Sequence, residues 1–285
     1  MKPITELLSL LELRQLDENR FQGESKDIGS RSVFGGQVLA QALNAATRTV
    51  APDRLAHSLH GYFVLPGDME QPILYEVDRI RDGRSFTTRR VVAKQNDKAI
   101  FIMAASFQIS EEGFDHQIEM LNVPPPESLE SVSAIAGRMA EQFGFKPRGL
   151  FAADSPIDAR PVENINPLKP GKRPPFRHLW FRSNGEMPDE PARHRYVMAY
   201  ASDFYLLISA LLPHGVPLFM NTGLQIASID HAMWFHRDFR ADDWLLYAID
   251  SPSASNARGF CRGNIFSRDG RLVASVTQEG LIRRI

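Results

Sequence analysis

The order of expected structural elements occurs twice along the chain, once on each side of a proline-rich middle. In the first half a helix expected to be buried on most sides, 37–50, precedes four extended runs, at 57–64, 73–80, 86–95 and 99–109. In the second half the helix is 195–212 and the runs are 224–235, 245–251, 257–267 and 272–282. A repeat of this kind constrains the fold more than any single motif, because each half must be one supersecondary unit.

The runs in each half are joined by hairpin-length connections, which favours antiparallel strands over parallel βαβ units. We therefore predict an α+β fold in which each of two antiparallel sheets wraps around its own long hydrophobic helix. Some residues also match between the halves. Leu74-Tyr-Glu-Val-Asp pairs with Leu246-Tyr-Ala-Ile-Asp, and Gln108 and Gln278 lie 170 residues apart near the ends of the last strands.

Ten of the nineteen prolines lie between Pro124 and Pro175, where hydrophobic periodicity is weak. This composition is typical of a linker. We expect an N-terminal domain at 1–110, a linker at 111–176 and a C-terminal domain at 177–285.

The composition excludes several classes of protein. The 285 residues are 43% hydrophobic with a formal net charge of −1, so nothing indicates disorder or nucleic-acid binding. The one cysteine, Cys261, cannot form an internal disulfide, which fits a reducing compartment.

Charged residues interrupt the N-terminal leucines, so this segment is predicted to be an amphipathic helix rather than a signal peptide. The most apolar stretch, 196–212, is shorter than the roughly 20 residues of a membrane span. We expect a cytoplasmic protein without a membrane segment.

One acidic residue, Asp203, lies within this apolar helical stretch and is therefore expected to be buried. A buried carboxylate is costly unless it is hydrogen-bonded, so it either fixes the helix through neighbouring backbone or Ser202, or it has a function. Two neutral hydrogen-bonding residues, Ser228 and Gln278, lie in later strands. A helix packed across such a sheet could bring these three side chains together to hold and deprotonate a water molecule.

Other candidate sites are weaker. The chain has no Gly-x-Ser-x-Gly, P-loop or Gly-x-Gly-x-x-Gly motif, and its histidine pairs 57/60 and 231/236 point to opposite strand faces, so we expect no metal and no cofactor. Gly35-Gly36 could expose backbone N–H groups at a helix start, or could be an ordinary turn. A cluster of arginines around one hairpin is either a solvated sheet edge or a phosphate contact; its members are Arg79, Arg81, Arg84, Arg89 and Arg90.

Seven motifs, in order along nearly the whole chain, resemble those of the acyl-CoA thioesterase II family. They are Val33-Phe-Gly-Gly-Gln-Val, Leu65-Pro-Gly-Asp, Arg81-Asp-Gly-Arg-Ser-Phe, Tyr200-Ala-Ser-Asp, Ile229-Asp-His-Ala-Met-Trp-Phe-His, Ser253-Ala-Ser-Asn-Ala-Arg-Gly and Gln278-Glu-Gly. The resemblance implies two fused hotdog domains and hydrolysis of fatty acyl-CoA to a fatty acid and CoA.

The same resemblance assigns the catalytic residues Asp203, Ser228 and Gln278. The hydroxyl position is threonine in the enterobacterial member that this chain resembles most, so Ser228 is a departure that keeps the hydroxyl. An apolar tunnel for the acyl chain is expected along Phe204 to Leu212.

Two other functions stay open at this point. A hotdog protein could instead be an enoyl-CoA hydratase or dehydratase, although such enzymes generally use an Asp–His pair and no histidine is adjacent to Asp203 in sequence. A non-catalytic acyl-CoA-binding module is the third interpretation, but it has no use for a buried base. Exposed sheet edges further predict a homodimer or homotetramer.

Overall fold

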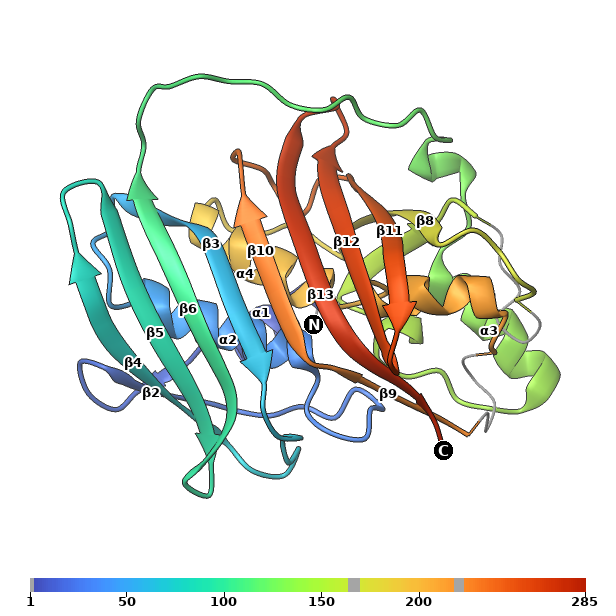
Figure 1. The fold of residues 1–285 in the computed structure, drawn as a ribbon, viewed down its shortest axis with the longest axis horizontal. Helices are drawn as coiled ribbons and strands as arrows, with labels where there is room; N and C mark the ends of the chain where they lie inside the picture. The colour runs from blue at the N-terminus through green and yellow to red at the C-terminus, as the bar shows by residue number, and fades with distance from the viewer. Residues whose placement is uncertain (1–2, 164–169, 218–222) are drawn as a thin grey trace.

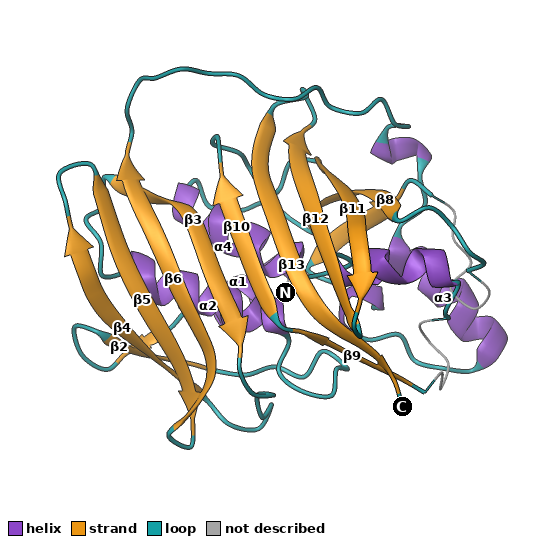
Figure 2. Cartoon of the chain, in the orientation of Figure 1, coloured by secondary structure: helices purple, strands orange, loops and turns teal. Residues whose placement is uncertain are grey.

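The computed structural model describes residues 3–163, 170–217 and 223–285, and its main feature is one antiparallel sheet with helices on one face (Figures 1 and 2). The helices are α1 Pro3–Leu11, α2 Gly35–Thr47, α3 Val132–Phe143 and α4 Pro191–Ser202, with 3₁₀ turns η1 Pro126–Ser128, η2 Gly149–Phe151 and η3 Leu207–His214. The strands are β1 Arg14–Gln15, β2 Arg20–Gly23, β3 Arg54–Phe63, β4 Ile73–Asp82, β5 Phe86–Gln95, β6 Lys98–Ile109, β7 Ile157–Pro161, β8 Phe176–Ser183, β9 Leu224–Ser228, β10 Asp230–Phe235, β11 Leu245–Ser255, β12 Arg258–Ser267 and β13 Leu272–Arg284. The predicted α+β class is confirmed.

The duplication is visible in the strand order. The first unit contributes β2-β4-β5-β6-β3 and the second contributes β10-β13-β12-β11-β8, which is the same order reversed. The two units join where β3 pairs antiparallel with β10, with Leu59 opposite Met233. This pairing joins the sheets of the two predicted units into one continuous sheet, a contact that the sequence analysis did not predict. Each unit also begins with a strand before its helix, β2 or β8, which the periodicity did not predict.

The first central helix, α2, is almost entirely enclosed. All but its first and last residues are buried, and it packs against α4 as well as against β3, β4, β5 and β6. Its buried polar residues Gln37, Gln41 and Asn44 are accommodated because each side chain donates a hydrogen bond to a backbone carbonyl of the preceding segment. The close approach of the helices depends on Gly36, where a Cβ atom would lie 2.4 Å from the backbone oxygen of Tyr200.

The second central helix is shorter than predicted. α4 ends at Ser202, Asp203 is its C-cap, and Tyr205 has a positive φ of 68° before η3 begins. The helix expected over 195–212 is therefore wrong in its second half. Periodicity could not detect the break, because the residues on both sides of it are apolar and buried.

The segment Pro191–His214 as a whole is long and apolar enough to be a membrane-span candidate by composition, but 72% of its most apolar window is buried inside the protein. This burial is what the core helix of a folded domain shows.

The proline-rich middle begins with an extended loop that runs from β6 over one end of the sheet to the second unit (Figure 1). Gln117 fastens it there, donating to Gly270 O at 2.8 Å and accepting from Leu272 N at 2.9 Å. Beyond it, α3 is capped by Ser131, and β7 pairs with β8. The middle thus contains ordered elements, and the domain limits at 110 and 176 stay predictions.

We predict opposite effects for two glycine-to-alanine substitutions in helices. Gly36→Ala should lower the free energy of unfolding by about 1–3 kcal/mol, because its methyl group would push α2 from α4. Gly137→Ala in α3, where nothing lies within 4 Å of the added Cβ, should raise it by about 0.5–1 kcal/mol through helix propensity. Urea denaturation measures both, and equal effects would contradict the tight helix contact.

Candidate active site

The three predicted site residues lie in mutual contact. Gln278 Nε2 donates to Asp203 Oδ1 at 2.6 Å and to Ser228 Oγ at 3.0 Å, and Ser228 Oγ lies 3.5 Å from Asp203 Oδ1. The Asp203 side chain is only 5% exposed, and Gln278 is fully buried. The expected burial of the carboxylate is therefore confirmed, although at the end of the helix rather than in its middle.

Local breaks in the strands position these side chains. The run 224–235, expected as one strand, divides at Ile229, whose N–H donates to Glu279 O and whose carbonyl accepts from Phe63 N. This break lets β9 pair with the end of β13, with Ser228 opposite Gly280. Alternation along β13 directs Val276, Gln278 and Gly280 toward the helices. Ser228 and Gln278 thereby meet beneath the C-cap of α4.

The first unit also reaches the site, through the beginning of α2. An added Cβ at Gly35 would lie 2.7 Å from Asp203 Oδ2 and 2.9 Å from the Phe63 ring. Only glycine leaves room for the carboxylate here. The first N–H groups of a helix have no partner within the helix and carry partial positive charge. The carboxylate therefore lies against a helix end that favours negative charge.

A buried histidine that the sequence reasoning missed stands beside the carboxylate. His231 Nδ1 lies 3.9 Å from Asp203 Oδ1 and has no hydrogen-bond partner among the described residues, while Nε2 is 2.9 Å from Ser202 Oγ. Burial lowers the pKa of His231 to about 4, with the Asp203 charge opposing the shift. The imidazole is therefore neutral near pH 7. The alternation of residues in β10 is the sequence signal that could have predicted the burial of His231, because His231, Met233 and Phe235 share the buried face.

Strand register shows that the first unit lacks this set of residues. If Tyr75 and Tyr247 are taken as equivalent, the pairing of β4 with β5 and of β11 with β12 makes Arg89 equivalent to Cys261. Arg89 pairs with Ala105 and Cys261 pairs with Gln278, so Ala105 is in turn equivalent to Gln278. The match of Gln108 with Gln278 expected from the sequence is corrected by this register. Leu59, which pairs with Ala105, then corresponds to His231. The first unit therefore has no counterpart of Gln278 or His231, although its Gly35 lies against the carboxylate.

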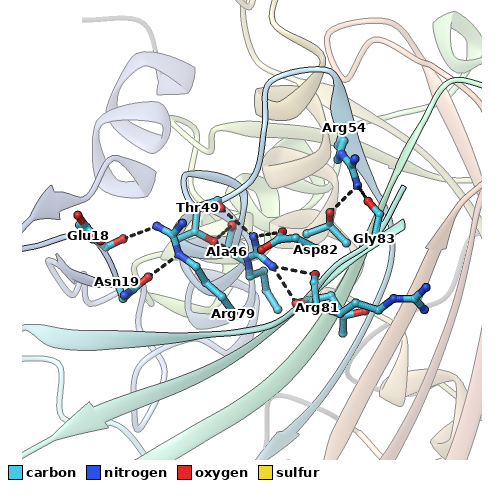
Figure 3. A network of polar contacts seen from close by, with 12 residues as sticks. Glu18, Asn19, Ala46, Thr49, Arg54, Arg79, Arg81, Asp82 and Gly83 are labelled. Atoms are coloured by element: carbon cyan, nitrogen blue, oxygen red, sulfur yellow. Dashed lines mark hydrogen bonds and ion pairs between the residues drawn. The ribbon is translucent and has the colours of Figure 1, made fainter. Parts of the chain in front are cut away.

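The arginine cluster of the first unit is mainly structural. Arg89 is 1% exposed and donates to Thr49 Oγ1, Thr49 O and Asp82 Oδ1 at 2.9, 3.0 and 2.6 Å. Figure 3 shows Thr49 and Asp82 in this network, with Arg79 directed to Asn19 and Arg54 to Gly83. Of the five cluster members, Arg79 and Arg89 are thus bonded within the protein, and Arg90 donates to Asp78 Oδ2 at 2.8 Å. The exposed Arg81 and Arg84 stay the candidates for a phosphate contact.

An apolar cavity of about 510 Å³ is lined by residues that neighbour Gly35 and Asp203 in the chain. Phe34, which directly precedes Gly35 in the chain, is one of its walls, and Phe204, which directly follows Asp203, is another. The two rings stack with their centroids 4.3 Å apart. Further walls come from α3 and from the segment after α4, including Ile208 and Leu211. A pocket of this size and character is typical of a small-molecule site.

Comparisons with known proteins agree with this architecture. Residues 22–108 match the family model described as the acyl-CoA thioesterase N-terminal domain, and residues 147–281 match the acyl-CoA thioesterase model. An acyl-CoA thioesterase 2 of Haemophilus influenzae is 42% identical over 98% of both chains. The human acyl-coenzyme A thioesterase 8 is 39% identical over 96% of this chain and 88% of its own.

Solved structures give the same answer. The acyl-CoA thioesterase II TesB2 from Mycobacterium marinum has a TM-score of 0.79 at 43% identity, covering 97% of this chain and 98% of its own. A hotdog-fold protein from Alicyclobacillus acidocaldarius has a TM-score of 0.76 at 21% identity over 96% and 97%, which supports the fold alone. The protein is thus a double-hotdog hydrolase. The chain belongs to the acyl-CoA thioesterase family.

The buried histidine predicts a specific pH dependence of stability. Its pKa in the folded protein, about 4, is below the ordinary value of 6.5, so the unfolded chain binds more protons between these values and stability falls as pH drops through that window. Between pH 4 and 6.5 we expect His231→Gln to reduce the slope of the unfolding free energy against pH. The reduction should correspond to at most one bound proton. Urea titrations from pH 4 to 7 measure it. An unchanged slope would mean that His231 titrates normally.

Proposed function

We propose that the protein hydrolyses fatty acyl-CoA to a free fatty acid and CoA, with Asp203 as general base. The observation that carries the proposal is the contact among Asp203, Ser228 and Gln278, together with the buried Gln278 Oε1, which accepts no hydrogen bond from the part of the chain that the structure describes. A buried acceptor beside a carboxylate is a suitable place for a water hydrogen.

In the proposed step, water oxygen bonds to the thioester carbon while one water proton passes to Asp203. Gln278 and Ser228 orient that water. The tetrahedral adduct then collapses, the C–S bond breaks, and the proton leaves Asp203 for the departing thiolate. Thiolate is a good leaving group, so no covalent acyl-enzyme is required.

The negative charge that develops on the carbonyl oxygen needs hydrogen-bond donors. The Gly35–Gly36 start of α2 is our proposed source, because it lies against Asp203 Oδ2 and its first backbone N–H groups have no helical partner. The first unit would then supply the oxyanion donors while the second supplies the base.

The acyl chain is proposed to occupy the cavity beside Phe34 and Phe204. Part of the expected tunnel, Phe204 to Leu212, contributes walls to it at Phe204, Ile208, Leu211 and Leu212. Burial of methylene groups there would contribute roughly 0.8 kcal/mol each to binding.

Hydration of an enoyl-CoA is the rival reaction, and His231 is the observation that favours it. The argument that no histidine accompanies Asp203 fails in three dimensions, since the two side chains are 3.9 Å apart. Thioester hydrolysis remains the proposal because Gln278 and Ser228 bond the carboxylate directly. A thiol-release assay beside measurement of enoyl absorbance separates the two reactions.

A cytoplasmic homodimer or homotetramer is also our proposal. The expected pairing through exposed sheet edges would be limited, because the strands at the two ends of the sheet order, β1 and β7, are only two and five residues long. The copies would therefore have to meet mainly through another surface.

Asp203→Asn should reduce turnover by about 10²- to 10⁴-fold, because it keeps the shape of the side chain but removes the base. Thiol release from acyl-CoA measures turnover, and thermal unfolding checks that the variant folds. Asp189→Asn is the control, since it makes the same substitution at a side chain that is 96% exposed and pairs with Arg240. Wild-type turnover by Asp203→Asn would refute the base assignment.

Two substitutions at Ser228 test the hydroxyl. Ser228→Thr should retain activity because Oγ1 can still accept from Gln278 Nε2, whereas Ser228→Ala should lose at least about 10-fold. Initial rates at saturating acyl-CoA compare them. Equal rates in the two variants would make the hydroxyl incidental.

A further inference from the structure

The residue directly before Asp203 is held by two buried side chains from the sheet. Ser202, the last residue of α4, is fully buried, and its Oγ lies 2.9 Å from His231 Nε2 of β10. Tyr247 of β11 donates from its hydroxyl to the backbone oxygen of Ser202 at 3.1 Å. We call Ser202, His231 and Tyr247 the Ser202 clamp. Its contacts fix both the side chain and the carbonyl group of one residue.

The chain at Asp203 is not held by regular helix structure. Asp203 is the C-cap of α4, Phe204 N donates to Ala201 O at 3.2 Å, and Tyr205 has a positive φ of 68°. A bulky residue with a positive φ persists only where the surrounding structure holds it. The Ser202 clamp acts where the helix changes into this turn, so it helps to determine where the carboxylate lies.

The hydrogen bonds of Ser202 define how the imidazole of His231 is used. Ser202 Oγ donates to Ala199 O at 2.9 Å, so it accepts the hydrogen of His231 Nε2. His231 Nδ1 is 3.9 Å from Asp203 Oδ1, which is too long for a hydrogen bond. The imidazole therefore acts on the carboxylate through Ser202 rather than by direct contact.

The equivalent positions of the first unit are built differently. Leu59 takes the place of His231, and Tyr75, the equivalent of Tyr247, donates to the side-chain oxygen of Gln41 at 2.6 Å instead of to a backbone carbonyl. A buried leucine needs no hydrogen-bond partner, whereas His231 Nδ1 has none among the described residues. Stability alone would favour the apolar residue, so the histidine indicates a functional requirement.

A glycine makes room for the contact of Tyr247. In the register of the strands, Gly263 of the second unit corresponds to Val91 of the first. An added Cβ at Gly263 would lie 2.3 Å from Tyr247 Cε2. The tyrosine ring thus occupies space that a side chain at position 263 would need, and its hydroxyl reaches Ser202.

We propose that His231 and Tyr247 are positioning residues, which hold Asp203 in place for the attack of water by fixing Ser202. The inference rests on the proposed function, in which Asp203 is the base. A displacement of about 1 Å can slow a reaction by about 100-fold. Loss of the Ser202 clamp should therefore lower kcat, while KM stays nearly constant because the clamp does not line the cavity.

Three substitutions at His231 separate the contributions of its two ring nitrogens. His231→Gln can place an amide N–H where Nε2 lies, so it should keep kcat nearly unchanged. His231→Asn, whose amide lies nearer the place of Nδ1, and His231→Leu, which copies the first unit, should lower kcat by about 10- to 100-fold.

Thiol release over a range of acyl-CoA concentrations gives kcat and KM for each variant, and thermal unfolding shows that each is folded. Wild-type kcat in His231→Leu would overturn the proposal. Activity in His231→Asn but not in His231→Gln would also overturn it, because the imidazole would then act directly on the carboxylate.

Ser202→Ala tests the contact itself. It should lower kcat about as much as His231→Leu, and the double variant should be no slower than either single one, since both changes remove the same hydrogen bond. Losses that multiply in the double variant would show that His231 acts independently of Ser202, which contradicts the proposal.

The duplication supplies a matched control for Tyr247. Tyr247→Phe and Tyr75→Phe each remove one hydroxyl that donates a buried hydrogen bond at equivalent positions. Both should lower the midpoint of thermal unfolding, but only Tyr247→Phe should lower kcat. Equal kcat values in these two variants would overturn the proposal.

Failure of this inference is distinguishable from failure of the proposed function. Wild-type turnover by Asp203→Asn would remove the base on which both depend. If Asp203→Asn loses turnover while His231→Leu and Tyr247→Phe keep the wild-type kcat, the proposed function stands and only the role of the Ser202 clamp is wrong.

Discussion

The burial of one carboxylate between the two halves is the constraint on which the site depends. Asp203 is held by Gln278 Nε2 from β13 and Ser228 Oγ from β9, and its other oxygen lies against Gly35 of α2. Two of these contacts depend on breaks in regular elements, because α4 ends at Ser202 and the strand run divides at Ile229. The third depends on a glycine, because a side chain at Gly35 would collide with the carboxylate. Such departures at one place are typical of a functional site, where local consistency is sacrificed for chemistry.

The duplication supplies two equivalent places in the fold, and they have opposite contents. Where the second unit has Cys261, Gln278 and His231, the first has Arg89, Ala105 and Leu59. Arg89 fills its position by bonding Thr49, close to the end of α2, so this place is closed by a structural cation. A fused pair of units can specialise in this way, since only one unit needs the base while the other contributes the helix start that faces it.

Much of the fold and the three central residues could be predicted from the sequence. Alternation and turn residues gave β5 with its observed limits, 86–95, and the apolar helices stood out because both are enclosed. The features that the sequence analysis missed are contacts between distant segments, or elements without a sequence pattern of their own. The pairing of β3 with β10 is a contact between units, β2 has only four residues, and the end of α4 lies inside a uniformly apolar run. His231 was missed because its neighbour Asp203 is distant in the chain.

The unsatisfied polar atoms give an independent argument for where the chemistry lies. In the described part of the chain the buried side-chain atoms without a partner belong to Arg177, His194, Tyr205, His231 and Gln278. All except His194 are at the Asp203 site or in the wall of the adjoining cavity. Folding gains nothing from leaving a buried donor or acceptor unpaired, because each costs about 1–3 kcal/mol. Their concentration at Asp203 and in the wall of one cavity indicates that a ligand bound there, rather than the fold itself, would supply the missing hydrogen-bond partners.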